Sequence, residues 1–152
     1  MILYKVNTCT KKQIKEHLDT CSSSFTPPLD TRVDIDHYSK KIYFQAKRFE
    51  AIEIYEHEDE AFFSGLPYLV GLIAVYENKD TDFITSVSVL PQYTGKNISS
   101  KLLSAYISAS TCKRIRLEVD KENLRAISFY KKHKFKVVKE KKEQRETLIM
   151  EL

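Results

Sequence analysis

The chain has 152 residues, enough for one domain that buries most of its apolar surface. Hydrophobic residues make up 42% of it, and three glycines and four prolines exclude a low-complexity or disordered protein. The net charge of +4 is too small to indicate nucleic-acid binding by itself. The longest apolar run, 68–76, contains Gly71 and is far too short to cross a membrane.

The cysteines and histidines indicate a reduced protein without a metal site. Cys9, Cys21 and Cys112 are odd in number and form no Cys-x-x-Cys pair, so we expect structural thiols and a cytoplasmic location. The first six residues lack the features of a signal peptide. The histidines lack the spacing of metal ligands, and so we expect no metal: they are His17, His37, His57 and His133.

The first half of the chain predicts a strand, two helices and two further strands. Residues 2–7 alternate as a strand, and 10–20 have helical character. A loop rich in serine and proline, 21–31, separates them from a second helix that runs to Phe49 and carries the spacing Tyr38, Ile42, Ala46, Phe49. Strands follow at 50–57 and 68–77, joined by an acidic loop.

The second half alternates strands and helices before a closing pair of strands. A strand at 83–90 stops at Pro91, and a helix at 97–110 follows. A strand at 113–120 and a helix at 123–133 come next. The closing strands lie near 135–141 and 145–151. This order predicts one α/β domain (α+β mixed), residues 1–152, with a mixed central sheet of about seven strands flanked by about four helices.

The most informative stretch is 117–135, which reads as a strand, a turn, a short helix and the start of a strand. Asn123 and Tyr130 are seven residues apart, which leaves them about 20° from each other around a helix. Both side chains would therefore face one ligand. The stretch resembles the second acetyl-CoA motif of the GNAT superfamily of N-acetyltransferases, with seven matches: Leu117, Val119, Asn123, Ala126, Phe129, Tyr130 and Phe135. His133-Lys134 replaces the usual Leu-Gly.

A second segment, 91–99, leads from a strand into a helix N-terminus, where unpaired backbone N–H groups and the helix dipole favour an anion. It resembles the first GNAT motif, which wraps the pyrophosphate of coenzyme A. Three positions depart from that pattern: Thr94 replaces Gln or Arg, and Asn97 and Ser99 replace glycines. Asn tolerates left-handed dihedrals and Ser is favoured at helix starts, so we expect a working site.

The resemblance implies acetyl-CoA as co-substrate and a GNAT-type acyl-CoA N-acyltransferase fold for almost the whole chain. In the family the pantetheine arm pairs with the strand before the phosphate loop, here through the backbone of residues 87–89, whose side chains would matter little beyond packing. Lysines after the tyrosine helix would approach the cofactor's 3′-phosphate. The implied cofactor-binding residues are Val87, Ser88, Val89, Thr94, Gly95, Lys96, Asn97, Ile98, Ser99, Ser100, Asn123, Phe129 and Lys132.

Two residues are candidates for the acetyl-transfer chemistry. Tyr130 is the expected general acid, because a phenol is protonated at neutral pH and can donate to the departing thiolate. Glu118 stands twelve residues before it, similar to the catalytic Glu of ribosomal-protein N-terminal acetyltransferases, and is the candidate base. A solvated strand glutamate is the alternative reading. A water chain ending on Glu118, Thr85 or Ser86 is another.

The charges are unevenly distributed. Residues 131–145 carry eight Lys or Arg and two Glu, whereas 50–60 carry six acidic residues and no Lys or Arg. Solvated faces explain both. The acidic stretch, from Glu50 to Glu60, would otherwise attract a cationic acceptor such as a polyamine. We expect a small-molecule amine acceptor rather than a peptide amino terminus, no nucleic acid, no membrane, and a possible homodimer. The alternative function is a non-catalytic acyl-CoA-binding or interaction module of the same fold.

Overall fold

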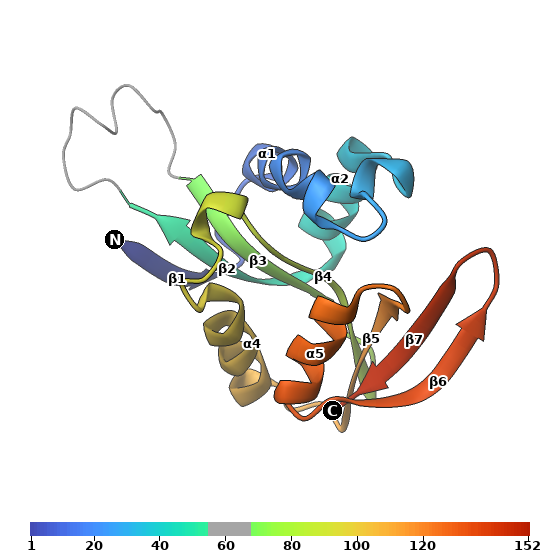
Figure 1. Cartoon of the computed structure of the whole chain (residues 1–152). Helices are drawn as coiled ribbons and strands as arrows, with labels where there is room; N and C mark the ends of the chain where they lie inside the picture. The colour runs from blue at the N-terminus through green and yellow to red at the C-terminus, as the bar shows by residue number, and fades with distance from the viewer. Residues whose placement is uncertain (55–67) are drawn as a thin grey trace. The chain divides into compact units, whose positions relative to one another are not determined.

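The computed structural model describes residues 1–54 and 68–152, and its elements follow the predicted order (Figure 1). The strands are β1 (Ile2–Val6), β2 (Lys47–Glu53), β3 (Tyr68–Tyr76), β4 (Thr81–Val89), β5 (Arg114–Asp120), β6 (Lys136–Lys142) and β7 (Glu146–Glu151). The α-helices are α1 (Lys11–Cys21), α2 (Ile35–Gln45), α4 (Ile98–Ala109) and α5 (Leu124–Lys132).

The strands form one seven-stranded sheet in the order β1-β2-β3-β4-β5-β7-β6. β4 and β5 run parallel, whereas β1 with β2, β5 with β7 and β6 with β7 are antiparallel. The parallel pair is connected through α4, as a parallel pair requires a crossover. The predicted mixed sheet with flanking helices is therefore confirmed.

The predicted helix that runs to Phe49 is wrong at its C-terminal end. α2 stops at Gln45 because Ala46 takes an extended conformation (φ −104°, ψ 144°), and β2 begins at Lys47. Phe49 then pairs with Val6 of β1, and its ring packs edge-on against Tyr106. Cross-strand pairing and burial thus override a helical spacing that the local sequence also permits.

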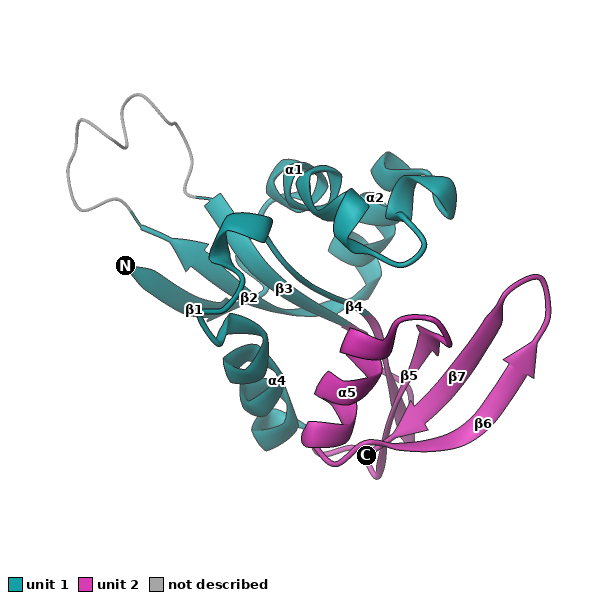
Figure 2. Cartoon of the chain, in the orientation of Figure 1, with its two compact units in different colours: residues 1–74, 86–110 teal, residues 75–85, 111–152 magenta. Residues whose placement is uncertain are grey.

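The chain divides into two compact units, residues 1–74 with 86–110 and residues 75–85 with 111–152 (Figure 2). In the first unit, α1 and α2 pack together on one face of the strands and α4 lies on the other (Figure 1). Gly71 allows the close approach of α4, because an added Cβ would lie 2.7 Å from Ile98 Cγ2 and 3.0 Å from Leu102 Cδ1.

α1 begins at a complete capping box. The Thr10 side chain accepts from the Gln13 N–H, and the Gln13 side chain accepts from the Thr10 N–H. Its inner face then buries residues at helical spacing: Ile14, His17, Leu18 and Cys21. One of the four, His17, is polar, and one of its hydrogen bonds joins α1 to Ser88 of β4.

The first unit also contains a buried ion pair. Arg48 Nε lies 3.1 Å from Glu50 Oε2, and the Glu50 carboxylate also accepts from the N–H groups of Thr8 and Cys9. Glu50 is fully buried. The hypothesis that Glu50 attracts a cationic acceptor is therefore wrong, since its charge is already compensated inside the protein. Glu53 pairs with the Met1 amino group, and residues 55–60 of that acidic stretch lie outside the described residues.

The second unit is built on β5, β7 and β6, with α5 between β5 and β6 in the chain. Its core is apolar and includes Leu117, Phe135 and Met150. β6 is exposed along nearly its whole length, and its pairing with β7 shifts register between Val137 and Lys139.

Candidate functional site

The segment predicted to hold the pyrophosphate forms a tight turn between β4 and α4. Pro91–Tyr93 is a single 3₁₀ turn, and the Thr94 hydroxyl donates to the Pro91 carbonyl. Gly95 follows with φ +83°, in the left-handed region that favours glycine. The Lys96 ammonium lies 5.1 Å from the centroid of the Tyr93 ring, at the exposed surface.

Asn97 supplies the turn that starts α4. Its φ is +62°, so it takes the left-handed conformation expected at a position where the GNAT pattern has glycine. Its side chain makes no capping hydrogen bond, and the helix is fixed instead by the burial of Ile98. The N–H groups of Ile98 and Ser99 lie in the first turn, ahead of the bond that the Lys101 N–H donates to the Asn97 carbonyl, and Ser100, also a predicted residue, follows them in the same turn. These N–H groups, together with the helix dipole, can bind an anion.

The strand before this loop, β4, is paired toward β5 over only part of its length. The parallel register runs from Thr81–Arg114 to Ile84–Leu117. Within the described residues, the printed register leaves the stretch Ser86–Val89 without a β5 partner on that side. Such a stretch can accept an extended ligand by backbone hydrogen bonding. It includes the three predicted pantetheine residues, whose side chains alternate: Val87 and Val89 are half-buried and Ser88 is buried.

His17 was not among the predicted site residues, yet it hydrogen-bonds to one of them. Its Nδ1 lies 2.8 Å from the Leu69 carbonyl oxygen, and its Nε2 lies 2.8 Å from Ser88 Oγ. His17 is 2% exposed, and burial lowers its pKa to about 4. The prediction that the Ser88 side chain matters little beyond packing is therefore wrong, because its hydroxyl connects β4 to α1. The signal in the sequence was a histidine on the apolar face of α1.

Asn123 lies at the N-cap of α5. Its Oδ1 accepts from the Ala126 N–H at 3.2 Å, and its own N–H donates to the Asp120 carbonyl. The Asp120 carboxylate accepts from the Glu122 N–H and lies 3.2 Å from Arg145 Nε. These contacts fix the turn from β5 into α5 and give Asn123 a structural role. The Nδ2 group of Asn123 is the part of the side chain not used as the cap acceptor.

Tyr130 lies in the last turn of α5, where the helix ends in a Schellman motif. The N–H of Phe135 donates to the Tyr130 carbonyl, and the N–H of Lys134 donates to the Lys131 carbonyl, both at 3.0 Å. Lys134 has φ +75°, at the position where the GNAT pattern has glycine. The rings of Phe135 and Phe129 have centroids 5.7 and 5.4 Å from that of Tyr130. The Schellman bonds therefore fix the backbone of Tyr130, and the two phenylalanine rings pack against its side chain.

The surroundings of Tyr130 keep its proton in place. The residue as a whole is half-buried, but its phenol is surrounded by protein, and this burial raises its pKa above the ordinary 10.0. A phenol in this state is a proton donor, not a base, at neutral pH. Phe129, the neighbouring predicted residue, is also half-buried.

Glu118 is exposed and already has partners in the described structure. The Thr147 hydroxyl donates to Glu118 Oε1 at 2.6 Å, and Lys141 Nζ lies 3.8 Å from the same oxygen. Its partners come from β7 and β6, and neither is a predicted site residue.

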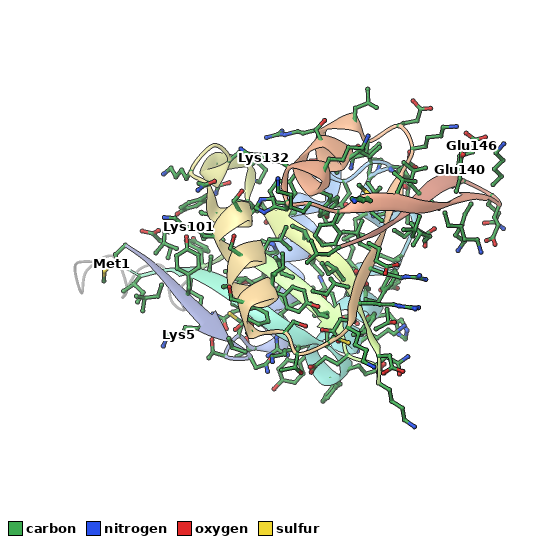
Figure 3. The ribbon with its side chains drawn as sticks, turned by 90° about the horizontal axis from the view of Figure 1, so that it is seen from below. Met1, Lys5, Lys101, Lys132, Glu140 and Glu146 are labelled. Carbon is green, nitrogen blue, oxygen red and sulfur yellow. The ribbon has the colours of Figure 1, made fainter. Side chains whose placement is uncertain are left out.

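Two basic residues of the stretch 131–145 have acidic partners within the second unit: Lys141 Nζ lies 3.8 Å from Glu118, and Arg145 Nε lies 3.2 Å from Asp120. Lys121, outside this stretch, lies 2.7 Å from Glu140 and 3.7 Å from Glu146, two residues at the far end of the β6–β7 hairpin (Figure 3). Lys132, the predicted 3′-phosphate residue, is exposed on the last turn of α5 (Figure 3).

Two of the three cysteines, Cys9 and Cys21, are buried and unsuited to nucleophilic chemistry. Burial raises the pKa of Cys9 and of Cys21 to about 12, so both are thiols at neutral pH. In the described part of the chain, no group of three or more His, Cys, Asp or Glu could hold a metal ion. None of the described helices is long and apolar enough to span a membrane.

The Acetyltransferase (GNAT) family profile matches residues 14–135. The chain therefore belongs to this family, which confirms the resemblance in both motifs, and acetyl-CoA is the co-substrate of its chemistry. Among curated proteins, none has a significantly similar sequence.

Solved structures share the fold along the whole chain. The ribosomal-protein-S18-alanine N-acetyltransferase of Escherichia coli is 15% identical, with a TM-score of 0.73, covering 100% of this chain and 93% of its own. NAA60 of Arabidopsis thaliana, bound to a bisubstrate analogue, is 13% identical with a TM-score of 0.72, covering 100% and 97%. Naa50 of the same plant, bound to the bisubstrate analogue CoA-Ac-MVNAL, is 22% identical with a TM-score of 0.66, covering 98% and 97%.

Proposed function

We propose that the whole chain is one N-acetyltransferase domain, which transfers the acetyl group of acetyl-CoA directly to a primary amine within a ternary complex. The observation that carries this proposal is the backbone of the 91–99 loop. Asn97 replaces a glycine of the family pattern and still has φ +62°, so the turn into α4 keeps its anion-binding shape. The pyrophosphate would bind the first-turn N–H groups of α4, and the pantetheine arm would bind the unpaired edge of β4.

The chemistry needs a base for the amine and an acid for the thiolate. The amine nitrogen attacks the thioester carbonyl carbon, the carbon–sulfur bond breaks, and the amide forms. We assign the proton that reaches the departing sulfur to Tyr130, whose phenol is held protonated by burial. We assign the proton that leaves the amine to Glu118, whose carboxylate is oriented by Thr147. Tyr130 then regains a proton from solvent, and Glu118 releases to solvent the proton that it took from the amine.

Tyr130→Phe tests the acid. The ring keeps its contacts with Phe129 and Phe135, so folding and acetyl-CoA binding should be unchanged, while kcat should fall about 100-fold, within the range typical of a lost general acid. Steady-state kinetics beside calorimetric binding separates the two effects. Unchanged turnover in this variant would contradict the assignment.

Glu118→Gln tests the base. The glutamine oxygen can still accept from Thr147, so the strand contact is preserved and only the ionisable group is lost. We expect the acidic limb of the kcat/KM profile to disappear. A profile that keeps this limb would exclude Glu118 and favour the water chain that ends on Thr85 or Ser86.

For the acceptor we propose a peptide amino terminus. The expected small-molecule amine has no support in the comparisons, and the buried Glu50 removes part of the argument for a polyamine. The proposal rests on likeness to neighbours described as an S18-alanine N-acetyltransferase and as complexes with bisubstrate analogues. A panel of peptides with different first residues, run beside spermidine and an amino sugar, tests it. Turnover confined to the small amines would contradict it.

The non-catalytic module is the second candidate, and one observation favours it. The Thr94 hydroxyl, at the position of the pattern's Gln or Arg, is turned back onto the Pro91 carbonyl. Acetyl-CoA binding without turnover of any amine in the panel would select this module. The cytoplasmic location and the homodimer stay predictions.

A further inference from the structure

His17 connects three elements of the first unit through its two ring nitrogens. The ring projects from α1, Nδ1 contacts the backbone of β3 at Leu69, and Nε2 contacts the side chain of Ser88 on β4. Both distances are 2.8 Å, and His17 and Ser88 are 2% and 8% exposed. The contacts therefore form a buried link between α1 and β4.

The proton positions on this link follow from the partners. The Leu69 carbonyl can only accept, so Nδ1 carries the hydrogen and donates to it. The ring is neutral, because burial lowers the pKa of His17 to about 4, and so Nε2 is an acceptor. The Ser88 hydroxyl must then donate to Nε2. The Cys21 sulfur, 3.6 Å from the same nitrogen, is a weaker neighbour.

The link falls on the part of β4 that lies beyond its pairing with β5. Pairing with β5 stops at Ile84, so the backbone around Ser88 is held by a strand on one side only, where the sheet continues to β3. Just beyond it, the Leu90 N–H donates to the Val70 carbonyl at 2.8 Å. If this edge of β4 stays open for a ligand, no neighbouring strand can hold it on that side. The hydrogen bond from Ser88 to His17 holds it instead from the face of the sheet that α1 covers.

We propose that His17 is a positioning residue for cofactor binding: through Ser88 it holds the open edge of β4 in the conformation that accepts the pantetheine arm. The proposal rests on the proposed function of β4. It assigns His17 no contact with acetyl-CoA and no proton transfer. It also explains why a buried polar side chain occupies the apolar face of α1, where a leucine would pack without any hydrogen bond.

Two substitutions separate the two hydrogen bonds. In His17→Gln, the amide oxygen can reach the Nε2 position and accept from Ser88, but the bond to Leu69 is lost. In His17→Asn, the amide nitrogen can donate to Leu69 as Nδ1 does, but the side chain is too short for Ser88. Ser88→Ala removes the same bond from the β4 side. Ile14→Val, a buried residue one turn earlier on α1, is the control for loosened packing without a polar change.

The experiment measures acetyl-CoA affinity by calorimetry, hydrogen exchange of the peptide 85–90 in the free protein, and Tm for all five proteins. We expect His17→Asn and Ser88→Ala to bind acetyl-CoA about 10-fold more weakly and to exchange faster at 85–90. His17→Gln should stay within about 2-fold of wild type, and Ile14→Val should lower only Tm.

Other outcomes overturn the proposal in distinguishable ways. If both histidine variants and Ile14→Val lose affinity in proportion to Tm, His17 is a core residue and nothing more. If wild type binds and all variants bind equally, the link does not position β4. If wild type binds no acetyl-CoA, the proposed function fails and the positioning role fails with it.

Discussion

The buried His17 should lower the free energy of unfolding in mild acid, and the size of this loss follows from the lowered pKa of its ring. In the folded state its pKa is about 4, because burial of the ring outweighs the hydrogen bond to the Leu69 carbonyl, which acts in the opposite direction, whereas an unfolded histidine has a pKa of 6.5. The unfolded chain therefore binds more protons between pH 6.5 and 4. Protonation in this window favours unfolding, so this contribution to stability is lost as the pH falls through it.

The two pKa values fix the size of the effect. Relative to pH 8, the lost stability is about 2 kcal/mol at pH 5 and about 3 kcal/mol at pH 4, at 1.36 kcal/mol per pKa unit. Because other groups also contribute to the pH dependence of stability, the comparison must be with a variant that lacks only the His17 imidazole. His17→Gln cannot ionise and keeps the acceptor for Ser88.

Urea unfolding of wild type and His17→Gln at pH 8, 6 and 5 measures the difference. We expect the stability gap between the two proteins to change by about 2 kcal/mol from pH 8 to pH 5, with wild type losing more. Ring carbon shifts of His17 followed by NMR should stay constant from pH 8 to pH 5. If the free energies of unfolding of the two proteins changed in parallel with pH, or if the His17 ring titrated near 6.5, then burial would not lower the pKa of His17 as argued.

The remaining predictions concern packing, backbone and thiols. Glu50→Gln leaves Arg48 buried without its counter-charge and should lower the free energy of unfolding by about 3–5 kcal/mol, while acceptor preference in the amine panel stays unchanged. Lys134→Gly should raise stability by about 0.5–1 kcal/mol, because φ is +75° there; Lys134→Ala, the control, should bring no gain. Gly71→Ala should cost about 1–3 kcal/mol in urea unfolding, since its Cβ meets α4, and wild-type stability would contradict that contact. Iodoacetamide at pH 8 should modify Cys112 before Cys9 and Cys21, as peptide mapping would show; early labelling of Cys21 would contradict its burial.

The sequence was sufficient for the element order because most segments carry their own signals. Alternation marks β4, Pro91 ends it, and the Asn-x-x-Ala-x-x-Phe-Tyr spacing marks α5. The error at 46–49 arose because helical spacing and strand alternation both fit the same residues. Pairing of Val6 with Phe49, which decides between them, is a long-range contact that no local pattern contains.

In the candidate site, too, features that depend on neighbouring residues could be predicted from the sequence, whereas contacts between distant residues could not. The tolerance of Asn97 for a left-handed turn follows from its residue type, and the structure confirms it. Lys134 also takes a left-handed conformation, although lysine gives no such signal, because the Schellman bonds between 130–131 and 134–135 impose it. The contacts of His17 with Leu69 and Ser88 span 52 and 71 residues, so spacing arguments could not find them. The exposure of Glu118 was expected, but its bond to Thr147 was not.

The most direct test of the proposed acetyl-CoA site is a calorimetric titration of acetyl-CoA into wild type, Asn97→Gly and Asn97→Trp. Glycine keeps the left-handed turn that the loop requires, whereas a tryptophan side chain at φ +62° would strain the turn and cover the first N–H groups of α4. We expect one-to-one binding by wild type and by Asn97→Gly, and loss of binding in Asn97→Trp. Absence of binding by wild type, or equal binding by Asn97→Trp, would contradict the cofactor site at this loop.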